Sequence, residues 1–113
     1  MIYMGGLKMI ELTKDSFERE VHESKGITVV DFWSQSCMAC RALMPNVHAM
    51  AERYTGKVKF CTFDVGLGRH IAMAEQVLGL PAILIYVDGD KKEHLTGEGL
   101  NTEQIEGSLS KYL

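Results

Sequence analysis

Asp31-Phe-Trp-Ser-Gln-Ser-Cys-Met-Ala-Cys-Arg-Ala-Leu-Met-Pro45 is the stretch of sequence that decides the fold. It begins inside a β-branched and aromatic run, Ile27 to Trp33, whose apolar residues fall on both parities, as in a strand buried on two faces. From Met38 to Tyr54 the apolar residues recur at helical spacing, and Gly56 supplies the stop. The sequence therefore places a Cys-x-x-Cys pair between a central strand and the start of a helix.

The segments on either side of this stretch alternate between helical and strand patterns. We expect helices over residues 15–24, 71–78 and from 102 onward, and strands over residues 58–65, 82–87 and 92–95. Asp15 with Glu18 and Asn101 with Gln104 have the spacing of helix-capping pairs, and Gly79 would end the 71–78 helix. Asp88-Gly89-Asp90 is a hairpin signal, so one strand pair is antiparallel. The order predicts an α/β fold with a central mixed β-sheet flanked by helices on both faces.

Length and charge limit the class of protein. A chain of 113 residues is expected to form one domain, over residues 9–113, with residues 1–8 as a short N-terminal extension. The net charge of −3 and the absence of a basic run argue against a nucleic-acid partner. The apolar runs are too short for a membrane span, and the amino terminus lacks the features of a secretory signal.

The cysteines indicate the compartment and the chemistry. Three cysteines are too few for the disulfide framework of a small secreted domain, so we expect a reducing, cytoplasmic location. Cys61 lies within the predicted 58–65 strand and is expected to be an inert buried thiol. A structural zinc site would need a second cysteine pair or two suitably spaced histidines. The histidines are scattered and fit no such pattern: His22, His48, His70 and His94.

Several spaced motifs together resemble the thioredoxin family. They are Val-Asp-Phe-Trp ending at Trp33, the Cys-x-x-Cys pair, Pro45, and Leu80-Pro81, with Gly79 and Gly97 nearby. The similarity extends from about Met9 to Leu113. It implies the thioredoxin fold and protein thiol–disulfide exchange without a bound cofactor, in which the protein cycles between a dithiol and a Cys37–Cys40 disulfide.

The helix start gives the two cysteines different expected roles. Unpaired N–H groups and the helix dipole favour the thiolate of Cys37, and in thioredoxin itself such a motif lowers the thiol pKa from about 8.5 to about 7. We therefore expect Cys37 to be the attacking nucleophile. Cys40 lies one turn further along the helix, where burial keeps it protonated, and is expected to be the resolving thiol.

The resemblance assigns the remaining site residues. Asp31 matches the buried acid that accepts the Cys40 proton, and an aspartate in an apolar strand should have a raised pKa. Pro81 matches the proline that thioredoxins hold in cis beside the cysteines. The substrate-binding surface implied by the family comprises Trp33, Gly79, Leu80, Pro81 and Gly97.

Some residues depart from the family pattern. Met38-Ala39 stands where most thioredoxins have Gly-Pro, Ser36 replaces a tryptophan, and Phe60 stands where many members have a lysine. The resemblance implies disulfide-containing protein substrates, a monomer, and an electron donor similar to thioredoxin reductase. The departures predict that this donor is not the standard one.

Three other functions remain open from the sequence. The chain could be a redox-inactive module that binds an extended peptide on the Pro81 surface. Alternatively, Cys37 and Cys40 could hold a metal ion or an iron–sulfur cluster across a dimer. An oxidase or isomerase would differ from a reductase only in redox potential.

Overall fold

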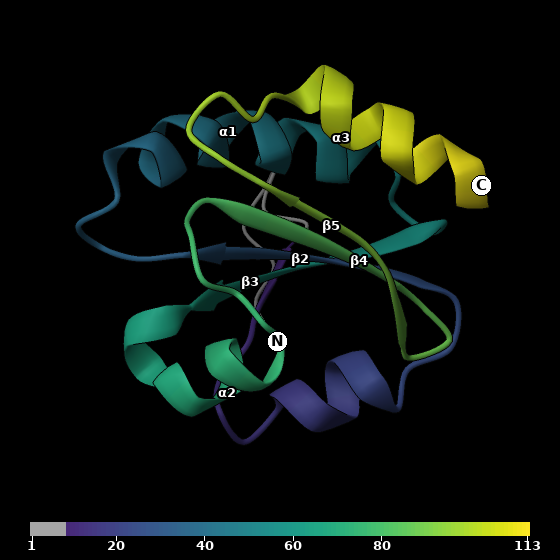
Figure 1. The fold of residues 1–113 in the computed structure, drawn as a ribbon. Helices are drawn as coiled ribbons and strands as arrows, with labels where there is room; N and C mark the ends of the chain where they lie inside the picture. The colour runs from purple at the N-terminus through teal and green to yellow at the C-terminus, as the bar shows by residue number, and fades with distance from the viewer. Residues whose placement is uncertain (1–8) are drawn as a thin grey trace.

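The computed structural model describes residues 9–113, and within them one mixed five-stranded sheet forms the centre of the molecule (Figure 1). The strand order is β1-β3-β2-β4-β5. The parallel strands are β1 (Met9–Glu11), β3 (Val58–Asp64) and β2 (Ile27–Trp33). The strands β4 (Ala82–Val87) and β5 (Asp90–Thr96) add in antiparallel orientation. The expected mixed sheet is confirmed, whereas the expected 1–8 extension lies outside the described residues.

Helices cover both faces of the sheet, as the order of elements predicts. Figure 1 shows α1 (Met38–Arg53) and α3 (Thr102–Leu109) on one face, with α2 (Arg69–Ala74) and the helical turn Glu18–His22 on the other. The Asn101 cap is confirmed: its side chain accepts from the backbone N–H of Gln104 at 2.9 Å, and the Gln104 side chain accepts from the N–H of Asn101 at 3.1 Å. This reciprocal pair satisfies two free donors at the helix start.

The central strand β2 is buried on both faces. Val29 packs with apolar residues of α1 and α3, whereas Val30 and Phe32 pack on the opposite face with Phe17 and Phe63. Val29, Val30 and Phe32 have no exposed surface. Each face of β2 therefore contributes to a separate apolar layer, and a polar side chain on this strand has no route to bulk water.

The first predicted helix begins and ends differently from the prediction. Thr13, not Asp15, caps it: the Thr13 hydroxyl accepts from the Ser16 N–H at 3.1 Å, and the Ser16 hydroxyl accepts from the Thr13 N–H at 2.9 Å. The N–H of Glu23 then bonds to the carbonyl of Glu18, five residues back. The helical turn spans Glu18–His22 and is therefore shorter than residues 15–24, and the Thr13–Ser16 pair satisfies the first donors in place of Asp15.

The end of the 71–78 helix was also predicted wrongly. The helix α2 spans Arg69–Ala74, and Gln76, with φ of 65°, turns the chain before Gly79 is reached. The ammonium group of Lys91 bonds to the carbonyl of Glu75 at 2.6 Å and satisfies a helix-end acceptor from outside the helix. Leu78 consequently lies outside the helix and is 92% exposed.

The hairpin turn generates a stability prediction. Asp88 and Gly89 have φ of 52° and 88°, and a Cβ on Gly89 would lie 2.1 Å from the carbonyl oxygen of His22. Gly89→Ala is therefore expected to lower the free energy of unfolding in urea by more than about 2 kcal/mol. Gly107→Ala in α3 is the control, since its Cβ meets nothing within 4 Å and should add about 0.5–1 kcal/mol. A loss below about 0.5 kcal/mol for Gly89→Ala, the range of ordinary surface changes, would contradict the packing.

Candidate active site

Cys37 and Cys40 form a disulfide at the start of α1, with their Cα atoms 5.3 Å apart. Cys37 is the N-cap residue, in an extended conformation, and its sulfur accepts from the backbone N–H of Cys40 at 3.2 Å. Cys37 is partly exposed, whereas Cys40 is 0% exposed. The pair therefore has an outer sulfur next to the helix N-terminus and an inner sulfur in the core.

A tight turn delivers the chain from β2 to this position. After Trp33, the N–H of Cys37 bonds back to the carbonyl of Ser34 at 3.2 Å, and the N–H of Arg41 then bonds to the carbonyl of Cys37 at 3.1 Å. The helix thus begins immediately after the turn. Met38, its first residue, is 82% exposed beside the disulfide.

Asp31 is buried in the middle of the sheet without a polar partner. It pairs with Thr62 of β3 and Ile83 of β4, and its side chain is 0% exposed. Neither carboxyl oxygen is hydrogen-bonded to any residue of the described range. Burial raises the pKa of this carboxyl from 3.8 to about 8, in the direction that the sequence predicts.

The register of β2 places Asp31 on the helix side that carries the cysteines. Side chains two residues apart lie on the same face of a strand, and Val29 packs in the layer beneath α1. Asp31 therefore lies on the α1 face. Phe60, also on this face, is buried against the ring of Tyr54. Asp31 therefore has no lysine ammonium group at this position, where the family pattern has one in many members.

Strand register brings the cis-proline next to the end of β2. Phe32 pairs with Ala82, and Ala82 pairs with Thr96, so Pro81 and Gly97 follow at the same edge. The Leu80–Pro81 bond is cis, as expected, and the N–H of Gly97 bonds to the carbonyl of Pro81 at 3.2 Å. Figure 1 shows the start of α1, the segment before β4 and the segment after β5 at the same end of the molecule.

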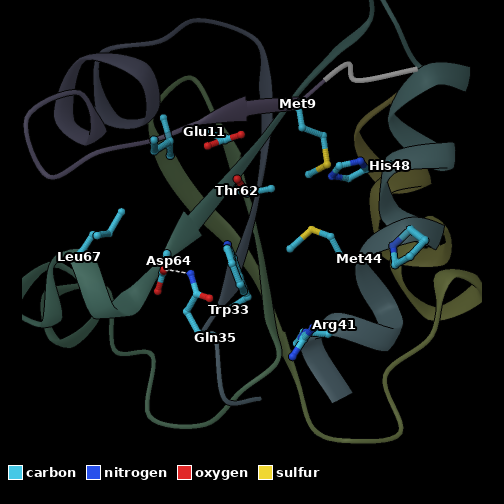
Figure 2. A pocket seen from close by; sticks show the side chains of 12 residues that line it. Met9, Glu11, Trp33, Gln35, Arg41, Met44, His48, Thr62, Asp64 and Leu67 are labelled. Carbon is cyan, nitrogen blue, oxygen red and sulfur yellow. Dashed lines mark hydrogen bonds between the residues drawn. The ribbon is translucent and has the colours of Figure 1, made fainter. Parts of the chain in front are cut away.

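Trp33 pairs with Asp64 of β3, whereas Pro81 precedes β4 on the other side of β2. Trp33 lines a cavity of about 770 Å³ between the β1–β3 edge and α1, where Gln35 donates to Asp64 at 3.3 Å (Figure 2). Gln35 and Arg41 also line this cavity and were not among the predicted site residues. The sequence signal for this region is that Trp33 and Asp64 end two strands that pair in parallel, so the residues that follow them lie at the same edge of the sheet.

The third cysteine has no role in this arrangement. Cys61 lies in β3 with no exposed surface, on the face opposite α1. Burial raises the pKa of its thiol to about 12, so the thiolate needed for nucleophilic attack hardly forms at neutral pH. Cys61 is the inert core residue that the sequence predicts.

Residues 9–113 contain neither a cluster of three potential metal ligands nor a membrane-spanning helix. No three histidine, cysteine or acidic side chains of that range are grouped to hold a metal ion. None of its helices has the length and apolar character needed to cross a membrane.

The comparisons with known proteins agree on one family. The family model described as Thioredoxin matches residues 8–111. A thioredoxin of Acetoanaerobium sticklandii is 44% identical over 93% of this chain and 100% of that protein. A thioredoxin of Peptoclostridium acidaminophilum is 38% identical over 93% of this chain and 96% of its own length. The chloroplastic thioredoxin M2 of Arabidopsis thaliana is 33% identical over 92% of this chain and 56% of that protein.

The disulfide geometry and the comparisons lead to the same conclusion. Thioredoxins act on disulfide substrates through a Cys-x-x-Cys pair, and the Cys37–Cys40 bond is the oxidised form of such a pair. The chain belongs to the thioredoxin family and is a protein thiol–disulfide oxidoreductase.

Proposed function

We propose that the protein is a disulfide reductase in which Cys37 attacks the substrate and Cys40 resolves the intermediate. The observation that carries this assignment is the difference in burial between the two sulfurs. Cys37 is partly exposed at the helix N-terminus, and its sulfur accepts the Cys40 N–H, which favours negative charge on that sulfur. Cys40 is fully buried, so a bulky substrate meets Cys37 first.

In the first step the Cys37 thiolate attacks one sulfur of the substrate disulfide. A bond forms between the Cys37 sulfur and that substrate sulfur, and the substrate disulfide breaks. The other substrate sulfur leaves as a thiolate and takes a proton from water. The product of this step is a mixed disulfide between the protein and its substrate.

In the second step Cys40 releases the substrate. The Cys40 thiol gives its proton to the Asp31 carboxylate, and the resulting thiolate attacks the Cys37 sulfur. The Cys37–Cys40 bond forms, and the remaining substrate sulfur leaves as a thiolate. The substrate has gained two electrons and the protein has lost two, so an external reductant must restore the dithiol.

The burial of Asp31 supports its role as the proton acceptor. With a pKa of about 8, about one-tenth of the carboxyl groups are ionised at pH 7, and the conjugate base is strong enough to accept a proton from a thiol. A surface aspartate would be fully ionised but a much weaker base. The rate of resolution should therefore rise with pH toward about 8.

The segment around the cis-proline is the proposed binding surface for substrates. Gly79 and Gly97 lack side chains, so the backbone of a substrate can approach closely, and Leu80 and Pro81 lie between them. Trp33 closes the opposite side of the site, where it lines the cavity shared with Arg41. The substrates of this surface are disulfides of other proteins.

The assignment of the two cysteines predicts different behaviour of their variants. Cys40→Ser should accumulate mixed disulfides with substrate proteins, because the attacking sulfur remains and the resolving sulfur is gone. Cys37→Ser should accumulate none. Non-reducing electrophoresis of each variant after reaction with oxidised insulin measures the difference.

Cys61→Ser is the control for these variants, and it should keep the activity of the unchanged protein, since Cys61 is buried on the far face of the sheet. Equal trapping by Cys37→Ser and Cys40→Ser would contradict the assignment of roles.

We also propose that the electron donor is a dedicated thioredoxin reductase. Met38 is 82% exposed and Ser36 is exposed beside the disulfide, so the surface that a reductase meets differs from the family pattern. Loss of one aromatic anchor at an interface weakens binding by about 2 kcal/mol, or roughly thirtyfold. Turnover with a standard NADPH-dependent thioredoxin reductase should therefore be poor.

A comparison of three proteins measures this effect. Relative to the unchanged chain, Ser36→Trp and the double variant Met38→Gly with Ala39→Pro should raise kcat/KM with the standard reductase. Chemical reduction by dithiothreitol is the control for intact disulfide chemistry. The proposal fails if the unchanged protein is already reduced as fast as ordinary thioredoxin.

A cytoplasmic location and a monomeric state complete the proposal. The presence of only three cysteines, one of them an inert core residue, supports a reducing compartment. Cell fractionation tests the location, and sedimentation tests the monomer.

A further inference from the structure

We infer that Thr96 is a positioning residue, whose hydroxyl group holds the substrate-binding backbone at Leu80 in place for extended protein substrates. This inference rests on the proposed reductase function and deepens it. Thr96 is the last residue of β5, directly opposite Ala82 of β4. Its hydroxyl oxygen lies 3.2 Å from the carbonyl oxygen of Gly79 and 2.9 Å from that of Pro81.

The Thr96 hydroxyl contacts the backbone of a segment whose middle is exposed, between the buried residues Val77 and Pro81. The nearest side-chain contact to the backbone before this segment is at Glu75, whose carbonyl accepts from the ammonium group of Lys91. Between Gln76 and β4, Leu78 is 92% exposed. Within the described range, the Thr96 hydroxyl is the side-chain donor to residues 77–81, and its single hydrogen is shared between the carbonyls of Gly79 and Pro81.

The two carbonyls that Thr96 contacts belong to Gly79 and Pro81, the residues on either side of Leu80. Neither the N–H nor the carbonyl of Leu80 bonds to a residue of the described range. Pro81 has no N–H, so Leu80 offers the donor next to the disulfide. An extended chain can pair with such a donor and acceptor as an added strand does at a sheet edge.

The two carbonyls depend on Thr96 to different extents. The Pro81 carbonyl has a second donor, the N–H of Gly97 at 3.2 Å, whereas no other donor of the described range reaches the Gly79 carbonyl. Loss of the hydroxyl would therefore release the Gly79 end and leave the Pro81 end held. Leu80 would then have to be ordered each time that a substrate binds, which weakens binding.

This arrangement selects a class of substrate. A disulfide within a protein segment that can extend beside Leu80 gains the two backbone hydrogen bonds. A small disulfide without a peptide backbone reacts at Cys37 and gains neither. The contribution of Thr96 should therefore be confined to peptide and protein disulfides.

The test compares Thr96→Val, which keeps the shape and removes the hydroxyl, with Thr96→Ser, which keeps the hydroxyl. Thr55→Val is the matched control, because Thr55 also donates to a backbone carbonyl, that of Glu52 at 3.0 Å. Thr55 lies beyond the far end of the 16-residue helix α1, which is about 24 Å long. The substrates are insulin, with dithiothreitol as the reductant, and the small aromatic disulfide 5,5′-dithiobis(2-nitrobenzoate). The second is mixed in a single turnover with reduced protein freed of dithiothreitol, because dithiothreitol reduces this disulfide directly.

For Thr96→Val we expect the KM for insulin to rise about fivefold, the effect of one lost hydrogen bond, with kcat unchanged. The rate with the small disulfide should not change. Thr96→Ser should keep the original KM, and Thr55→Val should change neither substrate.

An unchanged insulin KM in Thr96→Val, or an equal loss of rate with both substrates, would overturn the inference. These outcomes differ from failure of the proposed function, in which the unchanged protein itself would reduce neither substrate.

Discussion

The burial of β2 on both faces is the constraint on which the rest of the structure depends. The strand pairs with β3 on one side and β4 on the other, and separate apolar layers cover its two faces. A strand in this position ends at the edge of the core, and its continuation must turn outward. The turn at Ser34 to Cys37 and the start of α1 follow directly from that geometry.

The same constraint determines the electrostatics of the site. Asp31 is the one acidic residue of β2, and the strand buries it completely, where no residue of the described range donates a hydrogen bond to its carboxyl group. The folded protein keeps the Asp31 proton up to about pH 8, whereas the unfolded chain releases it near pH 3.8. Asp31 therefore makes the folded state less stable as the pH rises from about 4 to about 8. The same burial makes the Asp31 carboxylate a stronger base than an exposed aspartate, which supports its proposed role as the acceptor of the Cys40 proton.

Features with a local cause were predictable from the sequence. The apolar residues on both parities of β2, the helical spacing in α1 and the capping pair at Asn101 depend on neighbouring residues and were predicted correctly. The Asp88-Gly89 turn was predictable for the same reason. The positions of Cys37, Cys40 and Asp31 followed from where these elements meet.

Features that depend on distant residues were missed. The end of α2 depends on Lys91 from β5, and Gln76 turns the chain there without the glycine that commonly marks such a position. Thr13 is a local exception, because its hydroxyl pairs with Ser16 three residues away, and hydrophobic periodicity does not mark this contact. Thr96 reaches residues 79 and 81 only because β5 folds back beside β4, which strand pairing reveals and sequence spacing does not.

The most direct test of the account is a titration of the Asp31 carboxyl carbon by ¹³C nuclear magnetic resonance in the oxidised protein. The resonance can be assigned by its absence in Asp31→Asn. The burial of β2 predicts an inflection near pH 8. An inflection near pH 3.8, the value of an exposed aspartate, would contradict both the buried carboxyl and its role as the acceptor of the Cys40 proton.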